Sequence, residues 1–471
     1  MLFNSLHFIL FLPVVILLFY LTPGKLRWML LLGASCYFYM AFVPAYILIL
    51  FFIILLDFWV GIKLENSESQ KTRKLILTLS LIANISLLAF FKYFNFLNDN
   101  ITALLDLFHI QNKIEFLNIV LPIGLSFHTF QSMGYTIDVY YNKQKAERHL
   151  GYYSLYVLFF PQMVAGPIER YERLGNQLRE ISNKYLTYNN VSNGLRLILY
   201  GLFIKMTIAD NLADFVNIIY DNPLKYNSLS IVIGLTFYSF QIYSDFYGYS
   251  LIALGSARLM GINLMDNFKN PYLAKSISEF WSRWHISLST WFRDYLFIPL
   301  GGSRVKFARW FMNIMIVFSV SGLWHGASWA FVIWGALHGL TYLIERWLKD
   351  LFHFQEKTSF TFWGIIDVLK NFVIVTIIWV FFRGKDMSNI GDIFNAVFKN
   401  FRLVDDFHVP AKVWILLGFF VLSDIILFNN RYDKWCESKP IYVRWITYSL
   451  LIFAILALSG VNNNPFIYFQ F

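Results

Sequence analysis

The chain has 471 residues, of which 57% are hydrophobic, 20% are aromatic and only 14% are charged. A soluble globular protein carries about a quarter charged residues, so this composition excludes an ordinary soluble enzyme and predicts that lipid is the main solvent. Lys and Arg total 39 against 29 for Asp and Glu, which gives a net charge of +10. These cations cluster between apolar runs, where they suit anionic lipid headgroups better than nucleic acid.

The first apolar run and the two cysteines are candidates for a signal peptide and for disulfide or metal sites. The first apolar run has no basic residue before Lys25 and no small-x-small cleavage site after Tyr20, so we expect it to be a retained first span. Cys36 and Cys436 are far apart and lack the spacing of a zinc site, so the sequence predicts neither a disulfide framework nor a metal centre.

Uncharged runs predict the membrane helices, because a bilayer core of about 30 Å needs about 20 apolar residues per crossing. Residues 28–56 contain Pro44 and are predicted to form two helices that meet at a tight turn. The further runs are 75–91, 117–137, 150–168, 229–244, 310–344, 371–382, 411–423 and 445–460. We expect an all-α polytopic membrane protein with about eleven transmembrane helices, some short or broken. No repeat or linker divides the chain, which predicts one integral membrane domain over 1–471.

The stretch SEFWSRWHISLSTWFRDY at 278–295 is too polar to span lipid, although it is rich in tryptophan. At helical spacing, Trp281, Trp284 and His285 share one face, which places the imidazole among indoles. Prolines and glycines on both sides delimit the stretch, so we expect a re-entrant or in-plane helix buried among other helices. An interfacial amphipathic helix with an incidental histidine explains the local pattern about equally well.

Two more histidines, His325 and His338, lie in the phrases SGLWHGASW and WGALHG within the uncharged run 310–344. An imidazole inside a membrane is costly unless it is paired or functional, so the sequence favours a functional His325. The alternative is a neutral histidine bonded to a backbone carbonyl, and we prefer that interpretation for His338.

The run 310–344 is too long for one straight crossing of the bilayer. At a rise of about 1.5 Å per residue, its 35 residues extend about 52 Å, more than one bilayer core, so the helix must tilt strongly or turn near His325. Gly322 and Gly326 would let a neighbouring backbone approach this histidine closely.

These side chains suit acyl transfer. A neutral imidazole can take the proton of a hydroxyl as that hydroxyl attacks a thioester carbonyl, and a second imidazole or an indole N–H can hold the carbonyl oxygen as negative charge develops. His325, His285 and Trp324 are available for these tasks. Metal chemistry is less attractive, because the histidines have no carboxylate at ligand spacing and no HExxH pattern.

An acid inside an apolar run adds one more candidate. Asp245 lies in QIYSDFYGYS at 241–250, where it could orient a catalytic group. A buried acid in a membrane usually has a partner, so pairing with Arg258 or a loop arginine to hold two helices in register is at least as well supported.

Four segments, in order, resemble the membrane-bound O-acyltransferase family, in particular its bacterial alginate O-acetyltransferase-like branch. They are FFPQMVAGPIERY at 159–171, QIYSDFYGYS at 241–250 with NFKNPYLA at 267–274, FWSRWHISLSTWFRDYLFIPLGG at 280–302 and SGLWHGASWAFVIWGALHG at 321–339. They lie in a core of residues 120–345, and the closing NPFIYFQF at 464–471 is similar to the usual ending of the branch. Leu251 departs from the pattern, since related sequences tend to carry an acid after GYS. The prolines around Gly166 also predict a simple helix-terminating turn.

The resemblance implies a helical enzyme with a central funnel or tunnel, located in the bacterial cytoplasmic membrane. It implies an O-acyltransferase that moves acetyl groups from acetyl-CoA or another acyl thioester, bound as a substrate, for the O-acetylation of a polysaccharide with a periplasmic or extracellular acetyltransferase as partner. By the same resemblance His325 is essential and His285 lies across from it. We expect His325 to be the general base, His285 to polarise the thioester carbonyl, and Trp324, Trp284 and Asp245 to shape the site.

Three other interpretations fit parts of the sequence. A sister branch of the family moves D-alanine to teichoic acid with similar histidine motifs, although the wording of the AGPIERY and FIYFQF segments argues weakly against it. A proton-coupled transporter would also use buried histidines and broken helices, but it predicts paired halves that the sequence does not show. A structural scaffold would tolerate replacement of both histidines. Alginate, cellulose, peptidoglycan and other envelope glycans are all compatible acceptors.

Overall fold

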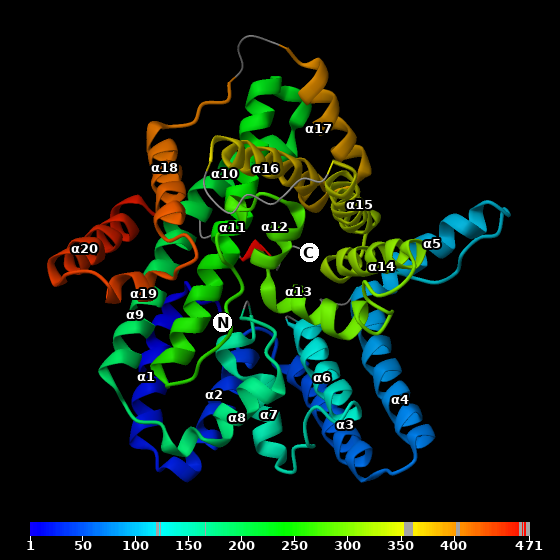
Figure 1. Cartoon of the computed structure of the whole chain (residues 1–471), viewed down its shortest axis with the longest axis vertical. Coiled ribbons are helices and arrows are strands. Elements are labelled where there is room, and N and C mark those ends of the chain that lie inside the picture. Colours follow the sequence, from blue (N-terminus) through cyan, green and yellow to red (C-terminus); the bar gives the residue numbers. More distant parts are fainter. Residues whose placement is uncertain are drawn as a thin grey trace. The chain divides into compact units, whose positions relative to one another are not determined.

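The chain forms two units of helices (Figure 1). The computed structural model describes residues 1–118, 122, 124–164, 166–352, 361–401, 406–460, 464 and 466–467. Every regular element in these residues is helical. Unit 1 comprises Met1–Val191 and Ser256–Met265, and unit 2 comprises Ser192–Gly255 and Asp266–Phe471.

Unit 1 is built around α3, which packs against α4, α6 and α7. Its helices are α1 (Leu6–Leu21), α2 (Arg27–Met40), α3 (Ile47–Asn66), α4 (Gln70–Leu88), α5 (Phe94–Asp106), α6 (Leu125–Tyr140), α7 (Leu150–Leu158) and α8 (Tyr171–Arg179). The predicted turn in 28–56 is confirmed, because α2 ends at Met40 and Pro44 opens a short 3-10 turn that leads into α3. The predicted helix end near Gly166 is also confirmed, since no helix continues from α7 into α8.

Unit 2 holds the segments with the candidate histidines. Its helices are α10 (Asp210–Asp221), α12 (Ile277–Arg283), α13 (Ile286–Phe292), α14 (Phe307–His325), α15 (Trp329–Phe352), α16 (Phe362–Arg383), α17 (Met387–Lys399), α18 (Ala411–Ile426), α19 (Tyr432–Glu437) and α20 (Ile441–Leu458). Most of α9 (Tyr188–Phe203) and of α11 (Ser228–Leu259) also belongs to it.

Of the two alternatives for the run 310–344, a strong tilt or a turn near His325, the structure shows the turn, because α14 ends at this residue and α15 begins at Trp329. Glycine allows the two helices to pack with their backbones in contact. A Cβ atom on Gly322 would lie 2.1 Å from the Phe331 carbonyl oxygen, and one on Gly335 would lie 2.1 Å from the Phe318 carbonyl oxygen. The α14–α15 hairpin therefore holds His325 at a fixed point in unit 2.

The prediction of one continuous helix over 278–295 is wrong. The segment forms two seven-residue helices, α12 and α13, and the chain breaks at His285, whose φ of 42° lies in the left-handed region. The cause is a contact distant in sequence. The carbonyl oxygen of Asn267 accepts the Ile286 N–H at 3.0 Å, and its side-chain oxygen accepts the Ser287 hydroxyl at 2.6 Å. These bonds compensate for the strained backbone.

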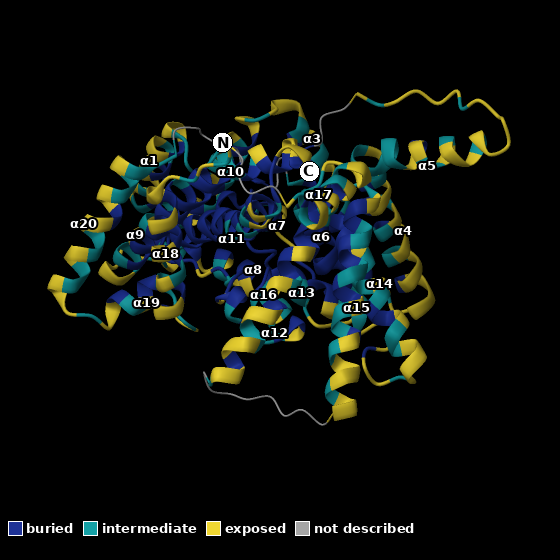
Figure 2. Cartoon of the chain, turned by 90° about the horizontal axis from the view of Figure 1, so that it is seen from above, coloured by how far each residue is buried: buried dark blue, intermediate teal, exposed yellow. Residues whose placement is uncertain are grey.

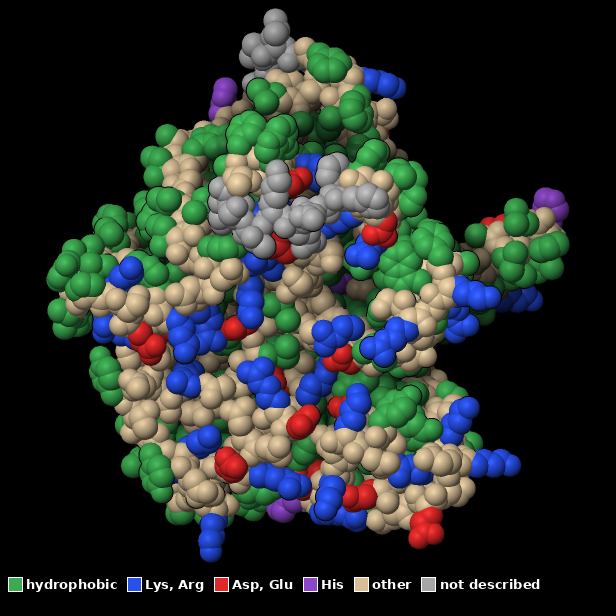
Figure 3. Space-filling model, in the orientation of Figure 1, with side chains coloured by type: hydrophobic (Ala, Val, Ile, Leu, Met, Phe, Trp, Pro, Cys, Tyr) green, Lys and Arg blue, Asp and Glu red, His purple; other side chains and the backbone are tan. Residues whose placement is uncertain are grey.

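Five helical stretches among the described residues are long and apolar enough to cross a bilayer, namely Pro44–Asn66, Gln70–Asp106, Phe307–His325, Phe362–Arg383 and Ile441–Leu458. Apolar side chains also cover the outer surface of α20 (Figure 3), where Leu456 is 82% exposed. Exposed apolar surface of this kind is stable in lipid and not in water, which indicates a membrane protein. Several other apolar helices are shorter, such as α1 with 16 residues.

Candidate active site

His285 lies at the break between α12 and α13 and is completely buried. The edge of its ring meets Phe246 of α11 at a centroid distance of 4.7 Å. Its carbonyl oxygen accepts the N–H groups of Leu288 and Ser289, both at 3.0 Å, so His285 opens the first turn of α13. The break in the helix therefore fixes the position of this imidazole.

His325 is the last residue of α14 and is only 4% exposed. Three aromatic rings surround it, with centroid distances of 4.9 Å to Trp324, 5.1 Å to Trp334 and 5.3 Å to Phe382. These rings come from α14, α15 and α16, so three helices position one imidazole in an apolar environment.

The two histidines meet inside unit 2. The centroids of His285 and His325 are 6.3 Å apart, with an angle of 54° between the ring planes, and the Trp324 ring lies 6.2 Å from His285. Two imidazoles and one indole ring thus lie together in a buried aromatic cluster. Such a set can accept a proton from a hydroxyl and donate hydrogen bonds to a carbonyl oxygen, and the surrounding rings exclude water.

Trp284 belongs to the second layer of rings in the same unit. It is 1% exposed, stacks on Phe280 at 5.4 Å and contacts Trp379 at 5.1 Å. Trp379 in turn stacks on Trp334, which touches His325. Trp284 therefore supports the wall of the candidate site through other indoles.

Asp245 is paired with a lysine. Its carboxylate lies 2.7 Å from the Nζ atom of Lys205, which also lies 2.7 Å from the carboxylate of Asp210. Arg258, the partner considered from the sequence, bonds to Asn263 instead. Sequence reasoning missed Lys205, although a lone lysine in the apolar run GLFIKMTIAD was a usable signal. Asp245 is connected to the histidines through its neighbour Phe246.

The Lys205–Asp245 pair also binds part of the closing segment 464–471. Asn464, Phe466 and Ile467 are the described residues of that segment. The Ile467 N–H donates to Asp245 Oδ2 at 2.7 Å, and Lys205 donates to the Asn464 carbonyl oxygen at 3.1 Å. The Phe466 ring contacts Phe246 at 5.7 Å. Phe466 thus packs against the ring that touches His285.

His338 contradicts the interpretation preferred from the sequence. Neither of its ring nitrogens has a hydrogen-bond partner in the described part of the chain, so no backbone carbonyl holds it. The ring is fully buried, 5.0 Å from Trp281 and 5.1 Å from Trp334. Trp334 therefore contacts both His338 and His325.

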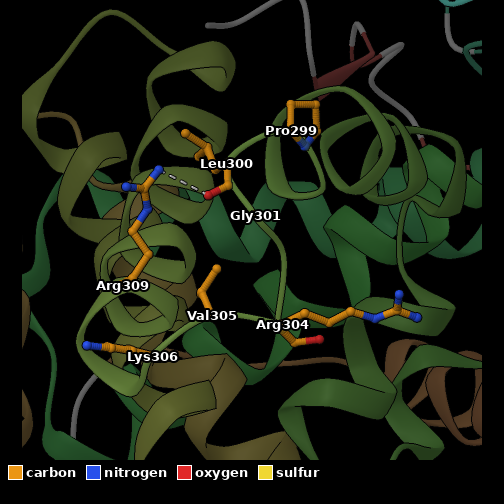
Figure 4. Close-up of a pocket in the computed structure, with 8 residues that line it drawn as sticks. Pro299, Leu300, Gly301, Arg304, Val305, Lys306 and Arg309 are labelled. Carbon is orange, nitrogen blue, oxygen red and sulfur yellow. Dashed lines mark hydrogen bonds between the residues drawn. The ribbon is translucent and has the colours of Figure 1, made fainter.

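An open cavity in unit 2 is separate from the histidine cluster. It has a volume of about 770 Å³ and is lined by Pro299, Leu300, Gly301, Ser303, Arg304, Val305, Lys306 and Arg309. Figure 4 shows the side chains of Arg304 and Arg309 pointing to different sides, and Arg309 donates to the Leu300 carbonyl oxygen at 3.3 Å. Because these cations do not converge, the cavity offers no single anion site. The described residues also contain no group of three His, Cys, Asp or Glu side chains suited to a metal ion.

Comparison with known proteins identifies the family. The model of the membrane-bound O-acyltransferase family matches residues 74–384, which include both histidines of the site. A peptidoglycan O-acetyltransferase of Helicobacter pylori is 35% identical over 421 residues, which cover 83% of this chain and 78% of that protein.

Two further relatives match different shares of the chain. A Pseudomonas putida protein named probable alginate O-acetylase AlgI is 33% identical over 501 residues and covers 100% of both chains. A teichoic acid D-alanyltransferase of Streptococcus thermophilus is 30% identical over 247 residues, which cover 48% of this chain and 57% of that protein. The family model, the full-length match and the buried histidines agree, and the chain belongs to the membrane-bound O-acyltransferase family.

Proposed function

We propose that this enzyme transfers acetyl groups from an acyl thioester such as acetyl-CoA for the O-acetylation of an envelope or extracellular polysaccharide. The observation that carries the proposal is the convergence of His285, His325 and Trp324 at centroid distances of 4.9 to 6.3 Å in a buried aromatic cluster. The relatives named as alginate O-acetylase and peptidoglycan O-acetyltransferase support the acetyl group and the glycan acceptor.

In this proposal His325 is the general base. A hydroxyl oxygen attacks the thioester carbonyl carbon, and its proton passes to a ring nitrogen of His325. His285 and the Trp324 indole N–H donate hydrogen bonds to the carbonyl oxygen while it carries negative charge. The carbon–sulfur bond then breaks, the thiolate takes the proton from His325, and both imidazoles return to their starting state. Trp284 and Asp245 keep these groups in position through Trp379 and Phe246.

The setting of the reaction is part of the same proposal. The chain forms one multi-pass domain over 1–471 in the bacterial cytoplasmic membrane, with a motif core at 120–345 and about eleven helices around a funnel or tunnel. Donor and acceptor would reach the histidines from opposite sides. A periplasmic or extracellular acetyltransferase would complete the modification as a partner protein. The uncharged runs and the exposed apolar helices support this arrangement.

The test is the O-acetyl content of envelope polysaccharides in cells that carry wild type, His325→Ala or His285→Ala at matched membrane abundance. We expect complete loss of ester acetate for His325→Ala and a loss of about a hundredfold or more for His285→Ala, as for removal of a general base or an oxyanion donor. His408→Ala, which changes an exposed histidine, is the control and should leave acetate at the wild-type level.

The result also distinguishes the acyl group. The glycan that loses acetate in the histidine variants is the acceptor. Unchanged acetate in every glycan would overturn the acetyl proposal, and D-alanine esters would then be measured in the same cells because one relative is named a teichoic acid D-alanyltransferase.

A further inference from the structure

Unit 1 carries an arm made of α5 and the extended segment after it, residues 94–118, here called the α5 arm (Figure 1). The arm continues from α4 through a π-helical turn at Ala89–Tyr93. Together these residues form a helical stretch of 37 residues, Gln70–Asp106. At about 1.5 Å per residue the stretch would extend about 55 Å, although about 20 residues suffice to cross a bilayer. Residues 75–91, which run from α4 into the π-helical turn, carry no charge and are about as long as one crossing requires, and the turn allows α5 to bend away.

Exposed apolar side chains line one face of α5 and continue into the segment after it, and Figure 2 shows in yellow that much of the arm is exposed. Leu97, Ile101 and Leu104 lie one helical turn apart on the exposed face of α5, and Leu104 is 56% exposed. Ile114 and Phe116 of the extended segment are 50% and 61% exposed. This amount of exposed apolar surface on a thin projection marks a contact with something other than water.

That surface continues the exposed side of α4. Leu75, Leu79 and Ile82 of α4 are all more than half exposed, and the apolar exposure continues through Phe90 into Leu97. Since α4 is part of a candidate membrane span, its exposed face contacts lipid. Leu97, Ile101 and Leu104 continue this apolar face along α5, and such continuity with a lipid-facing helix favours lipid over a protein partner as the occupant.

The backbone of the extended segment is hydrogen-bonded by amide side chains. Asn95 donates to the Leu117 carbonyl oxygen at 3.0 Å and accepts the Leu117 N–H at 2.9 Å. Asn98 donates to the Ile114 carbonyl oxygen at 3.1 Å, and Asn112 accepts the Ile114 N–H at 3.0 Å. A second bond links Asn112 to Asn98 at 2.7 Å. Water could make the same hydrogen bonds to the backbone of an exposed loop. These side-chain hydrogen bonds therefore stabilise the segment most where water is scarce.

Charged groups set the depth of the arm. Four charged side chains of the α5 arm are exposed, namely Asp99, Asp106, Lys113 and Glu115. Asp99 follows Leu97 by two residues and therefore lies on the opposite side of α5 from the apolar face. Charged side chains are costly in the hydrocarbon core but are readily placed among headgroups. We propose that the α5 arm lies in the interfacial layer of the bilayer, with its leucine, isoleucine and phenylalanine side chains among the acyl chains and its charges at the headgroups.

The experiment locates single cysteines by fluorescence quenching. Leu104→Cys and Ile114→Cys are labelled with an environment-sensitive maleimide and reconstituted in vesicles of phosphatidylethanolamine and phosphatidylglycerol. Quenching is measured with a nitroxide carried near the headgroup on the acyl chain, and separately with aqueous iodide. Leu79→Cys is the control for a lipid-facing helix, and Glu180→Cys is the control for an exposed polar position. Wild type provides the background from Cys36 and Cys436.

We expect both arm positions to be quenched by the lipid-borne nitroxide several-fold more than Glu180→Cys, and to be protected from iodide. Iodide quenching equal to that of Glu180→Cys would place the arm in water and overturn the proposal. Protection from both quenchers would indicate contact with protein, either a partner or a second copy of the chain, and would also overturn it. None of these readouts depends on the acetyltransferase activity.

Discussion

Lys205 determines what Asp245 does in this molecule. Its ammonium group lies between the carboxylates of Asp245 and Asp210, and all three side chains are at most 4% exposed. An unpaired charge in an apolar interior is strongly destabilising, so each of these groups depends on the others. The pairing also fixes Phe246, the next residue on α11, against the ring of His285. We therefore regard Asp245 and Lys205 as positioning residues.

We expect Lys205→Met to lower the free energy of unfolding by about 3–5 kcal/mol, because it leaves two buried carboxylates without their cation. Lys205→Arg keeps the charge and should lose much less. The measurement is thermal unfolding in detergent, together with O-acetyl transfer at equal amounts of folded protein. The double variant Lys205→Met with Asp245→Asn removes one of the stranded charges and should recover part of the lost stability. A single Lys205→Met variant as stable as wild type would refute the ion-pair argument.

Among the elements of unit 1, Glu147 joins the connection between α6 and α7 to α8. Its carboxylate accepts hydrogen bonds from Arg179 at 2.7 Å, from the Tyr171 hydroxyl and from the His149 N–H at 2.7 Å. Burial by itself would raise the pKa of Glu147, but these hydrogen bonds outweigh burial, so the pKa is lowered from its ordinary value. The connection outside the membrane spans is therefore held by an ionised acid.

The sign of the pH dependence follows from this lowered pKa. The carboxylate contributes stability above its unfolded-state pKa of about 4.3, and the contribution is lost as the pH falls through the folded-state pKa. Glu147→Gln should cost about 1.5–3 kcal/mol at pH 7, as for hydrogen bonds to a charged group. Its melting temperature should approach that of wild type as the pH falls below about 4.3 and through the lowered folded-state pKa of Glu147. Glu180→Gln, at an exposed position, is the control. A difference in melting temperature between Glu147→Gln and wild type that stays constant with pH would contradict the assignment.

The sequence predicts those elements that depend on neighbouring residues better than those that depend on residues distant in the sequence. The turn at Pro44 follows from proline, which acts locally, and it is confirmed. Run length left a strong tilt or a turn near His325, and the structure shows the turn. The break at His285 was not predicted, because it depends on hydrogen bonds to Asn267 from a preceding loop. Asp245 and His338 show the same limit. The sequence indicated buried polar groups. It did not show that Lys205 pairs with Asp245, or that His338 has ring neighbours and no hydrogen bond within the described part of the chain.

For the whole molecule, the expected number of membrane crossings is reached only if some short helices also cross the bilayer. Only five helical stretches of the described residues meet the length and apolarity of a full span. A total of about eleven needs helices such as α18, whose 16 residues extend about 24 Å. A helix of this length can cross if the bilayer thins locally or if flanking side chains reach the headgroups. Trp414 and Ile415 of α18 are exposed, as in a helix that faces lipid.

We expect α18 to cross, so that residues on its two sides lie on opposite faces of the membrane. His408→Cys precedes the helix and Asn430→Cys follows it, and both positions are exposed. In spheroplasts, a membrane-impermeant maleimide should label one of the two variants, while the other should react only after permeabilisation. Labelling of wild type gives the background from Cys36 and Cys436. Labelling of both variants from the same side would mean that α18 lies within one face, and the chain would then have fewer crossings than its apolar runs predict.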